Sequence, residues 1–388
     1  MLCYHRMGRR NAAQNGIWMP KSHHLEEITM KKMISLFLTI ALLTSLAGCA
    51  GTTVVVGNCT CPPEAHEPVE TPTAAPDDLP PEGMLKTGLA ILPSISKSTS
   101  ATADANGKAD FDVTIVAVTV DNEGVIHDCV IDSVAVAAEI GAAGNPVDIA
   151  PGSTTMAANS VQVLSKKEKG YDYGMVASGS KYEWFEQAAA LAQFAVGKTV
   201  DQVKGGYADD VDLATSASIY LGGYVAGIEA AVANAKSLGA EAGQELKMAV
   251  SASLETSVKE VGGVAQLNVD AVALTMLGDV ITSCTIDSLQ AAVEFDGTGT
   301  VTTDLSAAPK TKMQLGFDYG MVAYNASKIG LEWFEQVENF CAYVCGKTGA
   351  EVAGIAVTET TAPSDVDLAA ECSIAIGGFQ ALIAKAIG

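Results

Sequence analysis

The sequence predicts an α+β fold: two homologous repeat domains, each an antiparallel sheet packed with helices, behind an N-terminal leader and a disordered linker. Three observations lead to this prediction. A set of short motifs occurs twice in the same order, each copy contains two β-branched runs joined by a turn, and each copy continues into segments with helical spacing. We place the two repeat domains at 86–236 and 245–388.

The repeat is visible in several pairs of motifs. The longest pair is Gly-Tyr-Asp-Tyr-Gly-Met-Val-Ala at 170–177 and Gly-Phe-Asp-Tyr-Gly-Met-Val-Ala at 316–323. The shorter pairs are Cys-x-Ile-Asp-Ser (129–133 and 284–288), Glu-Trp-Phe-Glu-Gln (183–187 and 332–336), Gly-Lys-Thr (197–199 and 346–348) and Asp-Val-Asp-Leu-Ala (210–214 and 365–369). A common order with small changes of spacing indicates two homologous domains that differ in loop length.

Each copy should begin with a β-hairpin and end in helices. β-Branched runs around short turns predict the hairpins, with strands at 111–120 and 125–134 in the first copy and 265–275 and 280–289 in the second. One apolar stripe, formed by Trp184, Ala188, Leu191 and Ala195, predicts a helix over 181–196 that stops at Gly197. A last helix is expected from about 216 to 235 and from about 372 to 387.

Composition excludes several classes of function. The chain has 23 Lys+Arg against 45 Asp+Glu, a net charge of −22, so a nucleic-acid partner is not expected. Its 48% hydrophobic content is too high for a disordered chain. Residues 49–388 contain no arginine, and His66 and His127 are the only histidines there. The second copy therefore lacks the histidine of a hydrolase triad, and no arginine can clamp a phosphate.

The first 48 residues contain a targeting signal. Lys31 and Lys32 precede an apolar run over 33–46, which is shorter than the ~20 residues that span a bilayer. The run ends in Leu-Ala-Gly-Cys, which resembles the bacterial lipobox, where a peptidase cuts before the cysteine and the thiol carries diacylglycerol. The resemblance implies a lipoprotein signal peptide at 30–48, lipidation of Cys49 and a lipid-anchored protein on the outer face of a bacterial cell membrane.

One alternative and two neighbouring segments belong to this prediction. The cysteine at the end of the run is, in the competing interpretation, a chance residue after a cleavable signal. Residues 1–29 have no place in such a signal, so we expect an upstream extension from a misassigned start codon. Residues 49–85 hold the lipidated cysteine and a proline-rich, acidic stretch that predicts a flexible linker. Cys59 and Cys61 in this linker have no assigned role.

Several other motifs favour ordinary structural roles. The Gly-Lys-Thr triplets lack the upstream glycine of a phosphate-binding loop and end a helix, so we interpret them as helix stops. Cys341 and Cys345 lie four residues apart on one helix face, where the first copy has alanine and valine. Buried packing is therefore favoured over metal binding, and no metal site is predicted. Cys129 and Cys284 occupy equivalent strand positions and are expected to be buried thiols, with a disulfide between domains as the alternative.

Two segments in each copy are candidates for ligand binding. The first is a loop in which glycine lets the backbone approach a ligand and tyrosine offers a flat face, at Tyr173-Gly174 and Tyr319-Gly320. The second precedes the last helix, where an acidic residue and small polar residues open a helix whose amides would attract an anion. Its candidate residues are Asp212, Thr215, Ser216 and Ser218, with Asp367 and Ser373 in the second copy. A plain helix N-cap is the alternative.

The second segment resembles the end of the FMN-binding domains of exported bacterial electron-transfer proteins. That family has Asp, two variable residues, Ser/Thr, Gly, Ala and Thr/Ser, followed by an alanine-rich helix. The resemblance implies FMN linked through its phosphate to Ser218 or Ser373 by a flavin transferase. The family's glycine is replaced by Ser216 in the first copy and by Glu371 in the second. Because Glu371 would repel a phosphate, the first copy is the expected carrier.

These observations predict a membrane-anchored extracytoplasmic lipoprotein with two FMN-binding-like domains. Flavin binding and extracellular electron transfer are the first hypothesis, with a flavin transferase and a redox protein as partners. A non-enzymatic binding or structural lipoprotein of the cell surface, without cofactor, is the alternative. An electron carrier or binding protein is favoured over an enzyme, and no catalytic residues are assigned.

Overall fold

The computed structural model describes residues 83–141, 146–148, 159–258 and 262–388. The predicted upstream extension, signal peptide, lipidated Cys49 and nearly all of the linker lie outside these residues. The described residues belong to one compact unit of the chain. Among them, no helix is long and apolar enough to cross a membrane.

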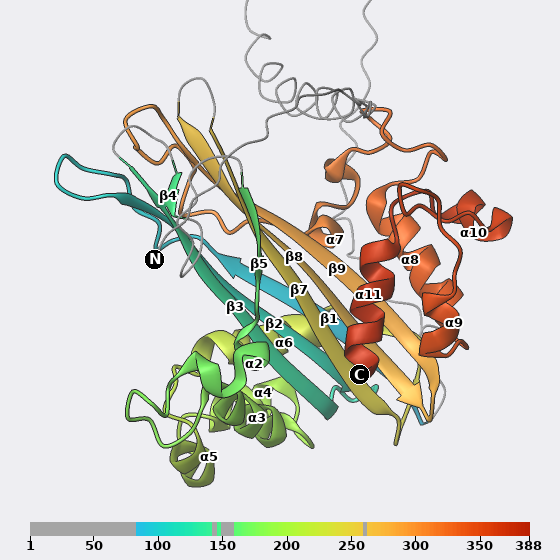
Figure 1. Ribbon diagram of the computed structural model, residues 1–388. Helices are drawn as coiled ribbons and strands as arrows, with labels where there is room; N and C mark the ends of the chain where they lie inside the picture. Colours follow the sequence, from blue (N-terminus) through green and yellow to red (C-terminus); the bar gives the residue numbers. More distant parts are fainter. Residues whose placement is uncertain (1–82, 142–145, 149–158, 259–261) are drawn as a thin grey trace, which may run out of the picture. The chain divides into compact units, whose positions relative to one another are not determined.

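Nine strands form two sheets in the described part of the chain, and every pair of neighbouring strands is antiparallel. The first sheet has the order β4-β3-β2-β1-β6, and the second has the order β5-β7-β8-β9 (Figure 1). The strands of the first sheet are β1 (Met84–Ser94), β2 (Gly107–Val120), β3 (Ile126–Ile140), β4 (Pro146–Asp148) and β6 (Lys236–Glu241). Those of the second are β5 (Asn159–Val163), β7 (Glu245–Val258), β8 (Gly263–Leu277) and β9 (Val280–Phe295).

Helices follow each set of long strands, in the same order in both halves. The first set is α2 (Lys166–Lys169), η2 (Gly170–Tyr173), α3 (Trp184–Ala195), α4 (Val200–Gly206), α5 (Val211–Ser216) and α6 (Gly222–Ala233). The second set is α7 (Lys312–Leu315), η3 (Gly316–Tyr319), α8 (Trp333–Val344), α9 (Gly349–Ala353), α10 (Val366–Glu371) and α11 (Gly377–Ile387). The paired motifs of the sequence thus fall on matching elements, while common ancestry of the two halves stays a prediction.

The two sheets pack face to face and each carries helices on its other face (Figure 1). One core lies between the sheets and includes Phe111 and Ile115 from β2 with Leu267 from β8. A second core joins the first sheet to α3 and α6, and a third joins the second sheet to α8 and α11. The architecture is therefore four layers, in the order helix, sheet, sheet, helix.

The burial of the long central strands explains how far the helices extend. In β2 and β8, buried and half-buried residues alternate over the first half, and every residue from Ile115 to Val120 and from Ala271 to Met276 is buried. Alternation is typical of a sheet with one covered face, and continuous burial is typical of a sheet covered on both. The helical layers therefore lie over the hairpin ends of the strands and leave the opposite ends of the outer faces uncovered.

The predicted α+β class is confirmed, and so are the two hairpins and the helix ending before Gly197, whose φ is +77°. The predicted start of the last helix is wrong, because α6 begins at Gly222 and α11 at Gly377. The sheets also exchange edges. Strand β5 lies within the predicted first domain but pairs with β7, and β6 begins at the end of that domain and pairs with β1.

Helix α6 approaches the first sheet unusually closely. A Cβ atom at Gly88 of β1 would lie 2.0 Å from the carbonyl oxygen of Ala231, and one at Gly227 would lie 2.7 Å from Val116 Cγ2. Gly88 pairs with Val118, and the corresponding position in the second sheet, opposite Leu274, is Lys247. The close contact between strand and helix backbones is thus specific to the first sheet.

We predict that Gly88→Ala lowers the free energy of unfolding by ~1–3 kcal/mol, because the new methyl group must push α6 off the sheet. Urea denaturation of the variant and the parent chain measures the change. Gly223→Ala is the matched control, since a Cβ there meets nothing within 4 Å. A Gly88→Ala protein as stable as the control would contradict the close packing described here.

Candidate functional site

The two tyrosine-glycine loops follow the short 3₁₀ helices η2 and η3. Gly174 and Gly320 end these helices with φ values of 84° and 80°, a left-handed conformation that favours glycine. The tyrosine rings before them are half-buried against the helical cores. Lys166 Nζ lies 5.8 Å from the centre of the Tyr173 ring, and Lys312 Nζ lies 5.1 Å from that of Tyr319. Each tyrosine face is thus already in contact with a lysine.

A buried glutamate holds each of these loops. In the first half, the amides of Met175 and Val176 donate to the two carboxylate oxygens of Glu183, at 3.0 and 2.9 Å. In the second half, the corresponding amides donate to Glu332 at 2.7 and 2.9 Å. Glu183 and Glu332 are 1% and 2% exposed. The repeated Glu-Trp-Phe-Glu-Gln motif therefore fixes the loop that precedes its own helix.

The glutamine of the same motif binds the candidate serine segment. Gln187 Oε1 accepts the amide of Ser218 at 2.6 Å, the Ser218 hydroxyl at 3.1 Å and the amide of Ile219 at 3.1 Å. Gln187 Nε2 also donates to the Tyr182 carbonyl at 2.8 Å. The structure thus brings the two candidate segments together, with α3 between them.

The second half repeats this contact. Gln336 Oε1 accepts the amide of Ser373 at 2.8 Å and its hydroxyl at 3.0 Å, and its Nε2 donates to the Leu331 carbonyl at 2.8 Å. Gln187 and Gln336 are 1% and 0% exposed. We call the Glu183–Gln187 and Glu332–Gln336 arrangements the two clamps.

The prediction that these serines open a helix is wrong. Helix α5 ends at Ser216, so Ser218 lies between α5 and α6, and Ser373 lies likewise between α10 and α11. The helix cap is Asp210, whose side chain accepts the Leu213 amide at 2.8 Å, and Asp365 does the same in the second half. Neither serine therefore caps or opens a helix.

The other candidate residues of this segment make local contacts. Thr215 Oγ1 and Ser216 Oγ both donate to the Asp212 carbonyl at 2.9 Å, within the turns of α5. Asp212 and Asp367 are exposed on the first turns of α5 and α10. They lie beside the capping aspartates, so each of these short helices begins with two carboxylates.

These residues do not fit an FMN phosphate. A phosphodiester at Ser218 needs a free hydroxyl and nearby donors, whereas this hydroxyl donates to Gln187. The groove between α3 and α5, of about 330 Å³, is lined by both Asp210 and Asp212. Two carboxylates in this groove would oppose the binding of a phosphate there.

A polar cluster under each short α2 or α7 helix was not recognised in the sequence. Asp132 Oδ1 accepts the amides of Ser133 and Lys167 at 2.7 and 3.1 Å. Asp287 Oδ1 accepts those of Ser288 and Met313 at 2.7 and 3.2 Å. Each aspartate therefore ties its sheet to the helix that follows. The available signal was the repeated Cys-x-Ile-Asp-Ser motif, which places an aspartate at the same position of two predicted strands.

Burial changes the proton affinity of these aspartates. Desolvation raises the pKa of Asp287 to about 6, against the hydrogen bonds from Thr311, Met313 and Ser288. The pKa of Asp132 is also raised by burial.

A lysine of each short helix also lies over the tryptophan of the next long helix. Lys166 Nζ lies 5.4 Å from the centre of the Trp184 ring, and Lys312 Nζ lies 5.1 Å from that of the Trp333 ring.

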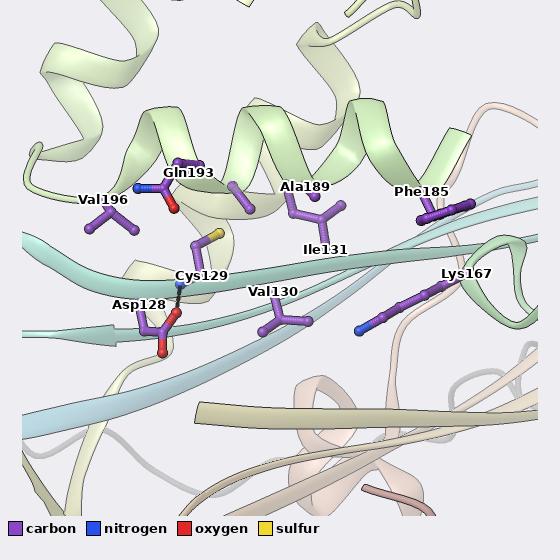
Figure 2. Close-up of a pocket in the computed structure, with 10 residues that line it drawn as sticks. Asp128, Cys129, Val130, Ile131, Lys167, Phe185, Ala189, Gln193 and Val196 are labelled. Carbon is purple, nitrogen blue, oxygen red and sulfur yellow. Dashed lines mark hydrogen bonds between the residues drawn. The ribbon is translucent and has the colours of Figure 1, made fainter. Parts of the chain in front are cut away.

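Two cavities lie at equivalent places, between the edge of each sheet and its first long helix. The first, of about 330 Å³, lies between β3 and α3 (Figure 2). There Cys129 points toward α3, Val130 points away from it, and Asp128 accepts the Cys129 amide at 2.9 Å. The second, of about 500 Å³, is lined by Cys284 of β9, by Cys341 of α8 and by Cys345, which directly follows α8. The described residues contain no group of His, Cys, Asp and Glu side chains arranged to hold a metal ion.

The predicted buried thiols are confirmed for Cys129, Cys284 and Cys341, while Cys345 is half-buried.

Comparison of the chain with protein-family models, with curated proteins and with solved structures found no match.

We predict that Gln187→Ala destabilises the protein by ~2–3 kcal/mol, since it removes the acceptor of two backbone amides and one hydroxyl. The amides of Ser218 and Ile219 should exchange with deuterium much faster, as measured by hydrogen exchange. Gln193→Ala, an exposed position on the same helix, is the control. Equal exchange in both variants would mean that the clamp does not hold this segment.

We also predict that Asp287 makes the protein less stable as pH rises. Its folded pKa of about 6 exceeds the ordinary value of 3.8, so the folded state binds more protons between these pH values. This contribution to stability is complete below pH ~4 and is lost as pH rises through 6, a change of ~2–3 kcal/mol. Urea denaturation from pH 4 to 7 should show a smaller loss for Asp287→Asn than for the parent chain. Asp318→Asn, at an exposed position, should behave like the parent, and identical curves for all three proteins would refute the assignment.

Proposed function

We propose that the chain is a lipid-anchored, non-enzymatic protein of the outer face of a bacterial cell membrane, which binds a partner without a cofactor. The observation that carries this proposal is the pair of clamps. In both halves the serine that would carry FMN is bound, through its amide and its hydroxyl, to a buried glutamine. The repeated motifs therefore serve the fold itself.

Exposed apolar side chains at matching positions support a binding role. Tyr171 is 68% exposed and Phe317 is 72% exposed, each at the second position of its 3₁₀ helix. Each ring packs edge-on against a phenylalanine of the following helix, Phe185 or Phe334, at 5.4 and 5.2 Å. Exposed aromatic groups of this kind are typical of contact surfaces. Two like surfaces on one tethered molecule favour a partner that engages both, because the second contact is then intramolecular.

Covalent FMN on Ser218, with extracellular electron transfer, is the second candidate. One observation favours it: Ser218 is exposed, so a flavin transferase can reach its hydroxyl. Attachment requires that hydroxyl to leave Gln187, and the adjoining groove is acidic. These contacts are the reason for preferring the cofactor-free proposal.

We predict that the chain coexpressed with a flavin transferase carries no FMN. Intact-mass spectrometry and absorbance in the flavin bands measure the adduct. The same measurement on Gln187→Ala tests whether the Ser218 hydroxyl is flavinylated once its hydrogen bond to Gln187 is removed. An FMN adduct on the parent chain that disappears in Ser218→Ala would replace our proposal with the flavin candidate.

We predict that Cys49→Ala releases the protein from the membrane or leaves its signal peptide uncleaved. A diacylated thioether supplies the apolar area that holds a lipoprotein in the bilayer, and the substitution removes the only atom that carries it. Partitioning of cell extracts between detergent and aqueous phases separates the two forms, with Cys59→Ala as the control. If Cys49→Ala still enters the detergent phase after processing, the lipid anchor at this position is disproved.

A further inference from the structure

The cavity beside the second sheet is lined by three thiols. Cys284 lies on β9, Cys341 lies on α8, and Cys345 directly follows the last residue of α8. Strand β6 borders the cavity with Leu238, and the ion pair between Lys236 and Glu338, at 2.6 Å, lies at its edge. The thiols thus gather where an edge strand faces a helix.

The three thiols line one cavity, and Cys284 and Cys341 belong to the same buried cluster between β9 and α8. The neighbouring Cys341 thiol and burial both raise the pKa of Cys284 above its ordinary value. The Cys345 thiol donates to the Cys341 carbonyl at 3.3 Å. Cys284 and Cys341 are 2% and 5% exposed, whereas Cys345 is half-buried and more accessible.

The equivalent cavity of the first half provides an internal comparison. Its strand thiol is Cys129, and the positions that correspond to Cys341 and Cys345 are Ala192 and Val196. One thiol cannot form an intramolecular bond there. The fold that the two halves share therefore does not require a cysteine on the helix opposite the strand cysteine, and the pair Cys284 and Cys341 is specific to the second half.

We propose that Cys284 and Cys341 form a disulfide bond, joining β9 to α8, when the protein meets a disulfide oxidant such as oxidised glutathione. A thiolate attacks the oxidant, one glutathione thiol leaves, and the second cysteine displaces the other. Two protein thiols thus lose two electrons and two protons, and one oxidised glutathione becomes two glutathione thiols. Cys345, the accessible thiol, takes up the first glutathione. Cys341 then attacks the glutathione sulfur, which frees the Cys345 thiol, and Cys284 displaces this glutathione as the second thiol.

The product suits the buried surroundings of the cavity. Burial raises the pKa of Cys345 to about 11, so the attacking thiolate forms only as the pH rises, and the oxidation should be faster at alkaline pH. A disulfide carries no charge and no unsatisfied donor, so it packs there as an apolar group. The proposed export supplies the oxidising surroundings, and the inference rests on the proposed function for that location only.

The test uses the full chain, purified in reducing buffer and then exposed to oxidised glutathione at mildly alkaline pH. Trypsin cuts after Lys310 and Lys328, between the two cysteines, so a non-reducing digest reports the bond as two linked peptides. We expect this link in the parent chain, in Cys372→Ala and, formed more slowly, in Cys345→Ala. We expect Cys341→Ala to lose it, and this variant should fold because alanine occupies that position in the first half.

Two results would overturn the proposal. One is the absence of linked peptides in the parent chain. The other is a link that survives in Cys341→Ala at the parent rate, which would make Cys345 the partner. Thermal unfolding gives a second measurement: oxidation should raise the Tm of the parent chain and leave that of Cys284→Ala unchanged. Because the oxidant is added to purified protein, failure here is separable from failure of the lipid anchor or of the cofactor-free proposal.

Discussion

The apolar contact between the two sheets is the constraint on which the rest of the structure depends. The inner faces of β2 and β8 carry large apolar side chains, Phe111, Ile115 and Leu267 among them, and all are at most 1% exposed. Neither sheet can leave such a face in water, so each must cover the other. Once the inner faces are paired, the apolar hairpin ends of the outer faces still require cover, and the two helical layers supply it.

The clamps solve a problem that this layered arrangement creates. Each helical layer returns over its sheet through irregular segments, whose backbone groups need partners wherever water is excluded. One buried glutamate and one buried glutamine, a helical turn apart, satisfy the loop before the helix and the segment after α5 or α10. Polar side chains inside the layers are thus tied to backbone amides, which is the usual condition for burying them.

Local patterns predicted the hairpins and the long helix because those elements are specified by nearby residues. The β-branched runs of 111–120 and 265–275 fall within β2 and β8, and the stripe that begins at Trp184 falls on α3. The exchanged edge strands β5 and β6 were not predicted, since their partners lie in distant parts of the chain. The last helix was predicted to start too early because the segment held by Gln187 contains no proline or glycine that would break a helix.

The sequence located the residues of the candidate site better than their role. It singled out the tyrosine-glycine loops and the serine segments, and the structure brings them together around α3 and α8. A serine next to small residues has the same sequence whether its hydroxyl faces a ligand or a glutamine of its own chain. Deciding between these needs the partner of Ser218, which lies 31 residues away along the chain. The proximity of Cys284 and Cys341 was not predicted for the same reason, because the two residues lie far apart along the chain.

The pairing of the sheets also has a consequence for the order of synthesis. The first sheet's long strands are complete at Ile140, but the strands that cover their inner face end at Phe295. At ~5–20 residues per second, the ribosome leaves that apolar face bare for on the order of ten seconds or more. The nascent chain must therefore be kept from aggregating during this interval. Under the proposed export, the two sheets would first meet after the extended chain has crossed the membrane.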